Sequence, residues 1–251
     1  MKKVVVLLMA LCMLVGTVML TGCGEKDDNV LVMATNAYFP PYEYYDGDKI
    51  VGIDAEIAEK IAEKLGMTLK IEDMEFATTL NAVEQGTVDF AMAGMTVTDK
   101  RLKQVNFTTS YANGVQAIIV KEDSAITCDD DLFADGATFK VGVQQGTTGD
   151  TYASDDFKDT GVEVVQYNNG NNAILALKGG DIDCVIIDNE PAKAYVQANE
   201  GLKILKTAYA DEDYAIAVNK SNTELLEKLN KAIDELIKDG TIDGIIAKYI
   251  K

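Results

Sequence analysis

The strongest constraint on the fold is a short unit that occurs twice along the chain. The first copy covers residues 80–93 and the second covers residues 174–187. Each copy consists of a segment of helical composition, a stopping glycine, a turn with an aspartate and a continuous apolar run. This order is typical of a helix that ends at a glycine and is followed by a buried parallel strand. Since the chain has 251 residues, the two copies predict two α/β lobes of about 100 residues each.

The rest of the chain from residue 30 onward also favours an α/β fold. Short apolar runs alternate with stretches in which apolar residues recur every three or four positions. Beyond the repeated unit, the predicted strands are residues 30–34, 68–71, 115–120, 139–143 and 162–166. The predicted helices are residues 53–65, which end at Gly66, and residues 223–238 and 242–249. We therefore expect a mixed, mainly parallel sheet flanked by helices in each lobe.

The composition excludes several classes of function. Histidine is absent, which excludes catalytic triads that contain histidine and zinc sites that depend on it. The 23 Lys and Arg residues face 41 Asp and Glu residues, a net charge of −18, so nucleic acid is not an expected partner. Acidic runs such as residues 129–131 lack the spacing of an oxygen-ligand loop. We predict helix caps or solvated surface there, and no metal site.

The N-terminus has the pattern of an export signal. Lys2 and Lys3 precede an apolar run over residues 4–20, which is shorter than the ~20 residues that a membrane-spanning helix needs. Leu20-Thr21-Gly22-Cys23 follows at once and resembles the bacterial lipobox. An ordinary signal peptide that happens to end near a cysteine is the alternative.

The lipobox resemblance implies a processed and anchored protein. Residues 1–22 would be a lipoprotein signal peptide, Cys23 the lipidated (palmitate-bearing) first residue of the mature chain, and residues 23–29 a polar tether. We therefore expect an exported protein, held at the outer face of the cell membrane or in the periplasm by its lipid anchor alone. Of the four cysteines, only Cys128 and Cys184 would then be free to pair, and the sequence leaves open whether they do.

Polar residues follow the apolar run of both copies of the unit. Gly94, Thr96 and Arg101 come after the first run, and Asp188 comes after the second. In open α/β sheets, ligands bind beyond the carboxyl ends of the strands. The two lobes are therefore expected to offer one polar loop each to a shared cleft.

Two of these residues have both a structural and a functional interpretation. Arg101 is the only arginine of the chain, and a guanidinium can grip a carboxylate with two hydrogen bonds, which lysine cannot do. It could equally be a surface residue paired with an acid. Asp188 could cap the helix that begins near Pro191, or it could face the cleft and hold a cation. Phe39 and Phe76 follow early strands, where core side chains are common.

Further motifs, taken together, carry a resemblance to a known family. In chain order they are Ala34-Thr35-Asn36-Ala37-Tyr38-Phe39-Pro40-Pro41-Tyr42-Glu43, Val51-Gly52-Ile53-Asp54, Ala93-Gly94-Met95-Thr96-Val97-Thr98, Arg101 with Phe107, Val143-Gln144-Gln145-Gly146-Thr147-Thr148-Gly149 and Asp239-Gly240-Thr241. Their order and spacing resemble the extracellular solute-binding proteins of polar amino-acid ABC importers, such as the glutamine, histidine and lysine-arginine-ornithine binding proteins. The likeness covers nearly all of residues 30–251 and implies the two-lobed, type II periplasmic-binding-protein (Venus-flytrap) fold.

The resemblance implies a role for each charged group of an amino-acid ligand. Arg101 would clamp the α-carboxylate, helped by the backbone N–H of Thr148 at a helix N-terminus. The carbonyl of Gly94, the hydroxyl of Thr96 and the carboxylate of Asp188 would hold the α-ammonium.

The resemblance also implies how the ligand side chain is read. Phe39 and Phe76 would enclose it through apolar or cation–π contact. The positions that determine its identity would be Asn36, Tyr38, Glu43, Gln144 and Thr147. Many relatives that bind basic amino acids have an acid near positions 36 or 38, which leaves a neutral polar ligand such as glutamine in play beside arginine and lysine. No second basic residue stands at these positions, which disfavours glutamate and aspartate.

The expected mechanism is a clamp that closes on the ligand. Residues 30–112 and 213–251 would form lobe 1, residues 115–210 lobe 2, and the crossings near residues 112–114 and 210–212 a hinge. The closed monomer would deliver its amino acid to the permease subunits of an ABC transporter, with no cofactor, metal or catalytic residue. The alternative from another class is a cyclohexadienyl dehydratase, which acts on prephenate or arogenate and shares the fold; there Asp188 or Glu190 would be the general acid.

Overall fold

The computed structural model describes residues 29–206 and 210–250 of the chain. The predicted signal peptide, the lipobox with Cys23 and nearly all of the tether lie outside the described residues. Within the described part, no helix combines the length and the apolar character that crossing a membrane requires.

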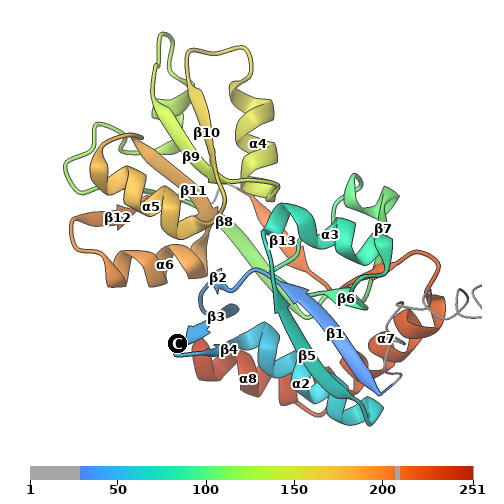
Figure 1. The fold of residues 1–251 in the computed structure, drawn as a ribbon. Helices are drawn as coiled ribbons and strands as arrows, with labels where there is room; N and C mark the ends of the chain where they lie inside the picture. The colour runs from blue at the N-terminus through green and yellow to red at the C-terminus, as the bar shows by residue number, and fades with distance from the viewer. Residues whose placement is uncertain (1–28, 207–209, 251) are drawn as a thin grey trace, which may run out of the picture.

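Two α/β lobes make up the molecule, as the repeated unit predicts (Figure 1). The first lobe contains a five-stranded sheet in the order β5-β1-β6-β14-β7. Strand β1 is parallel to β5 and β6, whereas β14 is antiparallel to both of its neighbours. The strand bounds are β1 Val30–Thr35, β5 Thr68–Asp73, β6 Phe90–Ala91, β7 Val105–Phe107 and β14 Ala217–Asn219. The helices of this lobe are α2 Ile53–Leu65, α3 Phe76–Gln85, α7 Thr223–Lys238 and α8 Thr241–Tyr249.

The second lobe contains a sheet in the order β10-β9-β11-β8-β12, and β13 also pairs with β8. Strand β9 is parallel to β10 and β11, and β8 is antiparallel to its partners. The bounds are β8 Ala112–Lys121, β9 Lys140–Gln144, β10 Glu163–Tyr167, β11 Cys184–Asp188, β12 Leu202–Ile204 and β13 Asp211–Tyr214. Helices α4 Thr148–Phe157, α5 Gly170–Gly179 and α6 Asn189–Ala198 flank this sheet, and a small hairpin sheet of β2 Tyr38–Phe39, β3 Glu43–Asp46 and β4 Lys49–Val51 lies in the first lobe.

The repeated unit occupies equivalent places in the two lobes. Helices α3 and α5 end at Gly86 and Gly180, whose φ angles of 71° and 83° lie in the left-handed region. The turn aspartate of each copy then binds the backbone of a neighbouring strand. Asp89 Oδ2 accepts from the N–H of Val32 at 2.8 Å, and Asp183 Oδ2 accepts from the N–H of Lys140 at 2.7 Å. Each unit is thereby fixed to its sheet, so that the chain emerges at the carboxyl end of a buried strand.

Helix boundaries follow from caps and from apolar periodicity. In α7 the buried residues recur every three or four positions and face the core: Leu225, Leu229, Ala232, Ile233 and Leu236. The side chain of Asn222 caps this helix by accepting from the N–H of Leu225 at 3.1 Å. The predicted helices at 53–65 and 223–238 are confirmed, and the helix of each repeated unit begins earlier than predicted, at Phe76 and Gly170.

The strand predicted at residues 115–120 is longer in the structure because its first residues pair with β13. Glu212 lies opposite Gly114 and Tyr214 lies opposite Ala112. Tyr214 also forms a β-bridge with Thr96 of the first lobe. Strands β8 and β13 therefore run together between the two sheets (Figure 1). A Cβ atom at position 114 would collide with the ring and hydroxyl of Tyr214, so any larger residue there would force that side chain to shift.

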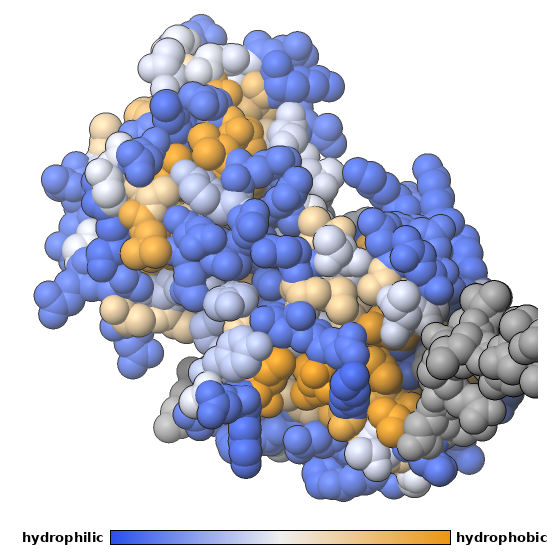
Figure 2. All heavy atoms as spheres, viewed as in Figure 1, coloured by the Kyte–Doolittle hydropathy of each residue, from blue (hydrophilic) through white to orange (hydrophobic). Residues whose placement is uncertain are grey.

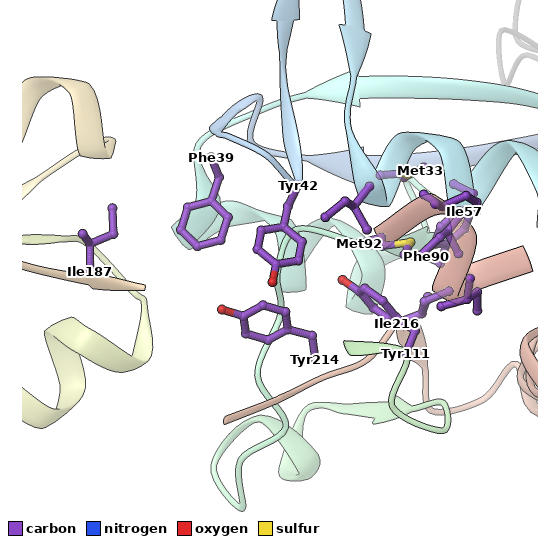
Figure 3. Packing of buried hydrophobic residues seen from close by; sticks show 14 of the residues in the cluster. Met33, Phe39, Tyr42, Ile57, Phe90, Met92, Tyr111, Ile187, Tyr214 and Ile216 are labelled. Carbon is purple, nitrogen blue, oxygen red and sulfur yellow. The ribbon is translucent and has the colours of Figure 1, made fainter. Parts of the chain in front are cut away.

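Aromatic side chains fill the region where the lobes meet. Figure 3 shows Phe39, Tyr42 and Tyr214 close together, with the Tyr42 and Tyr214 rings edge to face at 5.2 Å between centroids. Hydrophilic residues cover most of the face seen in Figure 2. Cys128 and Cys184 do not form a disulfide: both are free, and Cys184 is buried within β11.

The acidic run at 129–131 begins a short 3-10 helix, Asp129–Phe133. Asp131 Oδ2 accepts hydrogen bonds from the N–H groups of Thr127 and Cys128, which lower the pKa of its carboxyl. The helix-cap interpretation is confirmed for Asp131.

Candidate ligand-binding site

One cavity between the lobes brings together eleven of the twelve residues predicted to contact a ligand. The predicted residues that line it are Asn36, Phe39, Glu43, Phe76, Gly94, Thr96, Arg101, Gln144, Thr147, Thr148 and Asp188, and Ala93 completes the lining. Residues up to 101 come from the first lobe and residues from 144 onward come from the second. The cavity thus has the position that the two polar loops predict, beyond the carboxyl ends of the strands.

Arg101 begins a 3-10 helix of three residues, Arg101–Lys103. The hydroxyl of Thr98 accepts from the backbone N–H of Arg101 at 3.2 Å and fixes the start of this turn. The guanidinium is buried and lies over the ring of Phe76, 5.4 Å from its centroid. Burial lowers the pKa of Arg101 to about 10, so the guanidinium keeps its charge at neutral pH. Arg101 is therefore a fixed positive charge in the cavity wall and no surface residue.

Asp188 ends β11 and occupies the position before helix α6, where a capping side chain is common. Its carboxylate makes no capping hydrogen bond. Instead it accepts from Nε2 of Gln116 at 2.8 Å and from the hydroxyl of Tyr214. The carboxylate faces the cavity, so the capping interpretation is wrong for its side chain. Burial, and after it the charge of Glu212, raises the pKa of Asp188 well above its usual range.

The N-terminus of α4 forms the wall contributed by the second lobe. Thr147 caps this helix, since its hydroxyl accepts from the N–H of Asp150 at 3.2 Å and donates to the carbonyl of Gln144 at 2.8 Å. Thr148 is the first residue of the helix, where backbone N–H groups have no partner within the helix. The positive end of a helix is thus directed at the cavity, which favours an anion there.

Two phenylalanines line the cavity from the first lobe, and both are almost fully buried. Phe39 packs against the backbone of Gly94, where a Cβ atom would lie 2.6 Å from the ring. The φ angle of Gly94 is 52°, so both the contact with the ring and the backbone conformation require glycine at this position. Asp54 holds the same loop, because its Oδ2 accepts from the N–H of Gly94 at 2.9 Å.

Polar side chains meet at the part of the cavity where Asn36 lies. Nε2 of Gln144 donates across the lobes to Oδ1 of Asn36 at 2.9 Å, and Nδ2 of Asn36 donates to the carbonyl of Met74. Glu43 is fully buried, and neither of its carboxyl oxygens accepts a hydrogen bond from a described residue. Burial, and then the neighbouring charge of Asp54, raises the pKa of Glu43 well above its usual range. Glu43 is therefore a buried acid that lacks a donor.

One position expected to read the ligand lies outside the cavity. Tyr38 is not among the lining residues, and its ring packs edge-on against Tyr45 at 6.2 Å. Side chains alternate along a strand, so Phe39 faces the cavity and its neighbour faces away. The backbone carbonyl of Tyr38 instead accepts from the hydroxyl of Tyr195 in the second lobe.

The structure adds three residues around Asp188 that sequence reasoning did not place in the site: Gln116, Glu212 and Tyr214. All three are buried and lie on the two strands that run between the lobes. The sequence contained one indication that such a residue exists, because Glu212 is an acid inside the segment predicted as a hinge.

A possible set of metal-binding atoms lies away from this cavity. Among the described residues, ligand atoms of Cys128, Asp129 and Asp130 come within 4.8 Å of one another. They lie at the start of the 3-10 helix and are partly exposed or exposed, as acidic groups at helix starts often are.

Sequence comparison identifies the family of the chain. The model of the family described as bacterial extracellular solute-binding proteins, family 3, matches residues 31–251. The chain belongs to this family. The family expected from the sequence is confirmed, and so is the two-lobed type II periplasmic-binding-protein fold.

This solute-binding protein has relatives with named ligands. It is 32% identical over 257 residues to the arginine-binding extracellular protein ArtP of Bacillus subtilis, with 99% of this chain and 98% of the relative covered. Among solved structures, an ancestral arginine-binding protein bound to arginine is 41% identical with a TM-score of 0.84, covering 89% of this chain and 99% of that one.

Two further structures bear on the choice of ligand. An ancestral arginine-binding protein bound to glutamine is 39% identical with a TM-score of 0.83, covering 90% of this chain and 99% of that one. The ancestral amino-acid-binding protein AncCDT-1, a precursor of cyclohexadienyl dehydratase, is 27% identical with a TM-score of 0.81, covering 89% and 96%.

Proposed function

We propose that the protein binds a basic L-amino acid, L-arginine first, in the cavity between its lobes and delivers it to an ABC importer. The observation that carries this proposal is the set of charges in the cavity wall. Arg101 is the one basic residue among those that line it, and Asp188 and Glu43 are the acids. L-Arginine carries the complementary set: one carboxylate, one α-ammonium and one side-chain cation.

Each charge of arginine would meet one group of the wall. Arg101 and the N-terminus of α4 would bind the carboxylate, because a guanidinium fork and free N–H groups both favour an anion. Asp188, with the carbonyl of Gly94 and the hydroxyl of Thr96, would hold the α-ammonium. Glu43 would accept from the side-chain guanidinium, which would supply the donors that its buried oxygens lack.

Glu43 also favours arginine over glutamine. Positions 36 and 38 carry no acid, so the sequence also allowed a neutral ligand. In the structure, however, the acid at position 43 lines the cavity. A neutral side chain would leave this buried carboxyl without a cation. The names of the relatives agree, since ArtP and the ancestral protein are arginine-binding.

We also propose that the lobes close on the ligand. Residues 30–112 and 213–251 would move as lobe 1 and residues 115–210 as lobe 2, with β8 and β13 as the hinge. A ligand that contacts both lobes only in the closed form stabilises that form. The closed monomer would then dock on the permease. The site residues would bind and not catalyse, and the protein would need no metal or cofactor.

The N-terminal pattern supports an anchored protein. We propose that residues 1–22 are removed, that Cys23 carries the lipid, and that the protein is held at the outer face of the membrane. Mass spectrometry of the mature protein tests this. A diacylated N-terminal Cys23 is expected in the wild type, and a Cys23→Ala variant should be released without lipid.

Thermal unfolding with a panel of ligands tests the binding function. The purified protein, unfolded and refolded to remove carried-over ligand, is mixed with each of the twenty amino acids, ornithine, citrulline and cystine. Ligand that binds only the folded state at 100 times its Kd stabilises it by about 3 kcal/mol, so the cognate ligand raises Tm by several degrees. We expect the largest shift with L-arginine. A flat panel, together with turnover of prephenate or arogenate, would favour the dehydratase alternative.

A further inference from the structure

Glu212 is an acid buried at the crossing between the lobes. It lies on β13 and is 5% exposed. Its Oε2 accepts hydrogen bonds from the hydroxyl of Thr96 and from Nε2 of Gln116, both at 3.0 Å. Its Oε1 is buried and accepts no hydrogen bond from a described residue. Glu212 is thus a buried acid, and it also contacts the hydroxyl of Tyr152 and the carboxyl of Asp188.

The amide of Gln116 joins Glu212 to Asp188. Nε2 of Gln116 donates to Oδ2 of Asp188 at 2.8 Å and to Oε2 of Glu212 at 3.0 Å. Within the described part of the chain, neither carboxylate forms an ion pair with a lysine or arginine. The guanidinium of Arg101 donates to backbone carbonyls instead. Two buried acids therefore lie side by side, held by one neutral amide.

This pair adjoins the part of the cavity where the α-ammonium of the ligand would lie. Thr96 and Asp188 line the cavity, one from each lobe, whereas Glu212 is not among its lining residues. Glu212 contacts Thr96 directly, and it contacts Asp188 both directly and through the amide of Gln116. It is therefore placed to act on the ammonium position from both lobes without touching the ligand.

We propose that Glu212 is a positioning residue of the ammonium subsite, and that its charge makes its neighbour Asp188 retain a proton, which Asp188 gives up when the ligand ammonium binds. This inference rests on the proposed amino-acid-binding function. Without a ligand cation, two adjacent buried carboxylates repel each other, so Asp188 retains a proton. When the ligand ammonium enters, its charge stabilises the carboxylate of Asp188, and the proton passes from the carboxyl oxygen to the solvent.

The electrostatics of the site support this exchange. Burial and the charge of Glu212 raise the pKa of Asp188 well above its usual range, which favours a retained proton. The other titratable groups that face the pair are one guanidinium, one carboxyl and three phenols: Arg101, Glu43, Tyr42, Tyr152 and Tyr214. Burial raises the pKa of the Tyr42 and Tyr152 hydroxyls further above neutral, and Arg101 keeps its charge, so these three do not change charge on binding near neutral pH. The pKa of Glu43 is raised as well, so the experiment must separate its contribution from that of the pair.

Calorimetry in buffers of different ionisation enthalpy counts the protons released on binding. L-Arginine is titrated into the purified protein at neutral pH in phosphate and in Tris, and the difference in heat gives the proton count. Glu212→Gln keeps the shape but removes the paired charge. Glu212→Asp keeps the charge at a shifted position. Asp213→Asn removes the exposed acid next along the same strand and serves as the matched control.

The wild type and Asp213→Asn should release the same number of protons. Glu212→Gln should release fewer, because Asp188 then has no acidic partner, and should bind arginine about tenfold more weakly. Glu212→Asp should retain the release. Glu43 contributes equally to all of these proteins, so the difference between variants belongs to the pair. An unchanged proton count in Glu212→Gln would overturn the inference.

If Glu212→Gln does not fold, Glu43→Gln supplies the test, since it removes the other buried carboxyl with a raised pKa and leaves the pair intact. Proton release should persist in Glu43→Gln, and its complete loss would contradict the pair. Failure of the proposed function looks different: the wild-type protein would then bind no amino acid at all. Binding by the wild type with no dependence of the proton count on Glu212 would refute this inference alone.

Discussion

The guanidinium of Arg101 in the first lobe donates a hydrogen bond to the backbone carbonyl of Gly146 in the second, at 3.1 Å. A second hydrogen bond, at 2.7 Å, goes from its Nη1 to the carbonyl of Thr96 in its own lobe. The only arginine of the chain thus joins the two lobes across the cavity through neutral acceptors. A carboxylate is a stronger acceptor for a guanidinium than a carbonyl, which is why a ligand with an α-carboxylate would strengthen this connection.

Replacing Arg101 should therefore abolish ligand binding and leave the fold in place. We expect Arg101→Ala to weaken arginine binding by at least about 100-fold, on the order of 3 kcal/mol, because a charge-assisted bidentate contact is lost. Isothermal titration calorimetry measures the affinity and circular dichroism checks the fold. Lys100→Ala, which removes the neighbouring exposed cation, is the control and should bind like the wild type. Normal affinity in Arg101→Ala would exclude the clamp.

Glu43 should determine the preference for a cationic side chain. Glu43→Gln should lower the affinity for L-arginine about 30-fold, on the order of 2 kcal/mol, because the guanidinium loses its charged acceptor. The affinity for L-glutamine should change little, and calorimetry with both ligands measures the ratio. Glu63→Gln, an exposed acid on α2, is the matched control. Equal losses for arginine and glutamine would show that Glu43 does not read side-chain charge.

Asp54 should make stability depend on pH with a defined sign. Burial raises its pKa to about 6 in the folded protein, above the ordinary value of 3.8, although the N–H of Gly94 and the hydroxyl of Tyr111 act in the opposite direction. Between these two pH values the folded state binds more protons than the unfolded state. The free energy of unfolding should therefore fall as pH rises from about 4 to about 6, by on the order of 3 kcal/mol from this group.

Urea unfolding across that pH range measures the slope. The other buried acids with raised pKa values act in the same direction, so the test is the change caused by substitution. Asp54→Asn should flatten the curve, while Asp243→Asn, at an exposed position on α8, should leave the slope unchanged. If the free energy of unfolding of Asp54→Asn changed with pH as steeply as that of the wild type, the raised pKa could not be assigned to this residue.

Substituting two glycines should distinguish the stability cost of backbone strain from the cost of a steric contact at the site. Gly66 and Gly94 have φ angles of 68° and 52°, but only Gly94 has a ring within reach of an added Cβ atom. Gly66→Ala should lower the free energy of unfolding by about 1 kcal/mol through backbone strain alone. Gly94→Ala should cost about 1–3 kcal/mol more, because Phe39 must shift, and it should also weaken ligand binding. Chemical denaturation and calorimetry compare the two, and equal costs would mean that Phe39 moves freely.

The sequence predicted the fold well because the constraints on it are local. A stopping glycine, a turn aspartate and an apolar run act within a few residues, and this unit is found in both lobes. The positions of Arg101 and Asp188 in the site could also be predicted, because each follows a predicted strand and strand ends gather at one edge of a sheet. Eleven of the twelve residues that the family resemblance singled out line one cavity in the structure.

Other features depended on contacts between distant segments. The pairing of β8 with β13 extended a predicted strand by residues whose partners lie about 100 positions away in the chain. Tyr38 and Phe39 are neighbours in sequence, but only the direction of the strand decided which of them faces the cavity. Glu43 was expected at the ligand side chain and Glu212 in the hinge, but only the packed structure shows that both acids are buried.

The sequence by itself thus determined the α/β architecture, the family and the position of the cavity beyond the carboxyl ends of the strands. Periodicity, turn chemistry and motif order can all be recognised in short stretches of the chain. The tertiary structure decided the electrostatics of the site. It buried Glu43 without a hydrogen-bond donor and placed Glu212 beside Asp188 on one amide, and neither relationship can be derived from positions that are so far apart in the chain. Burial is what raises the pKa values of Glu43 and Asp188, and burial is a property of the packed molecule rather than of any segment of it.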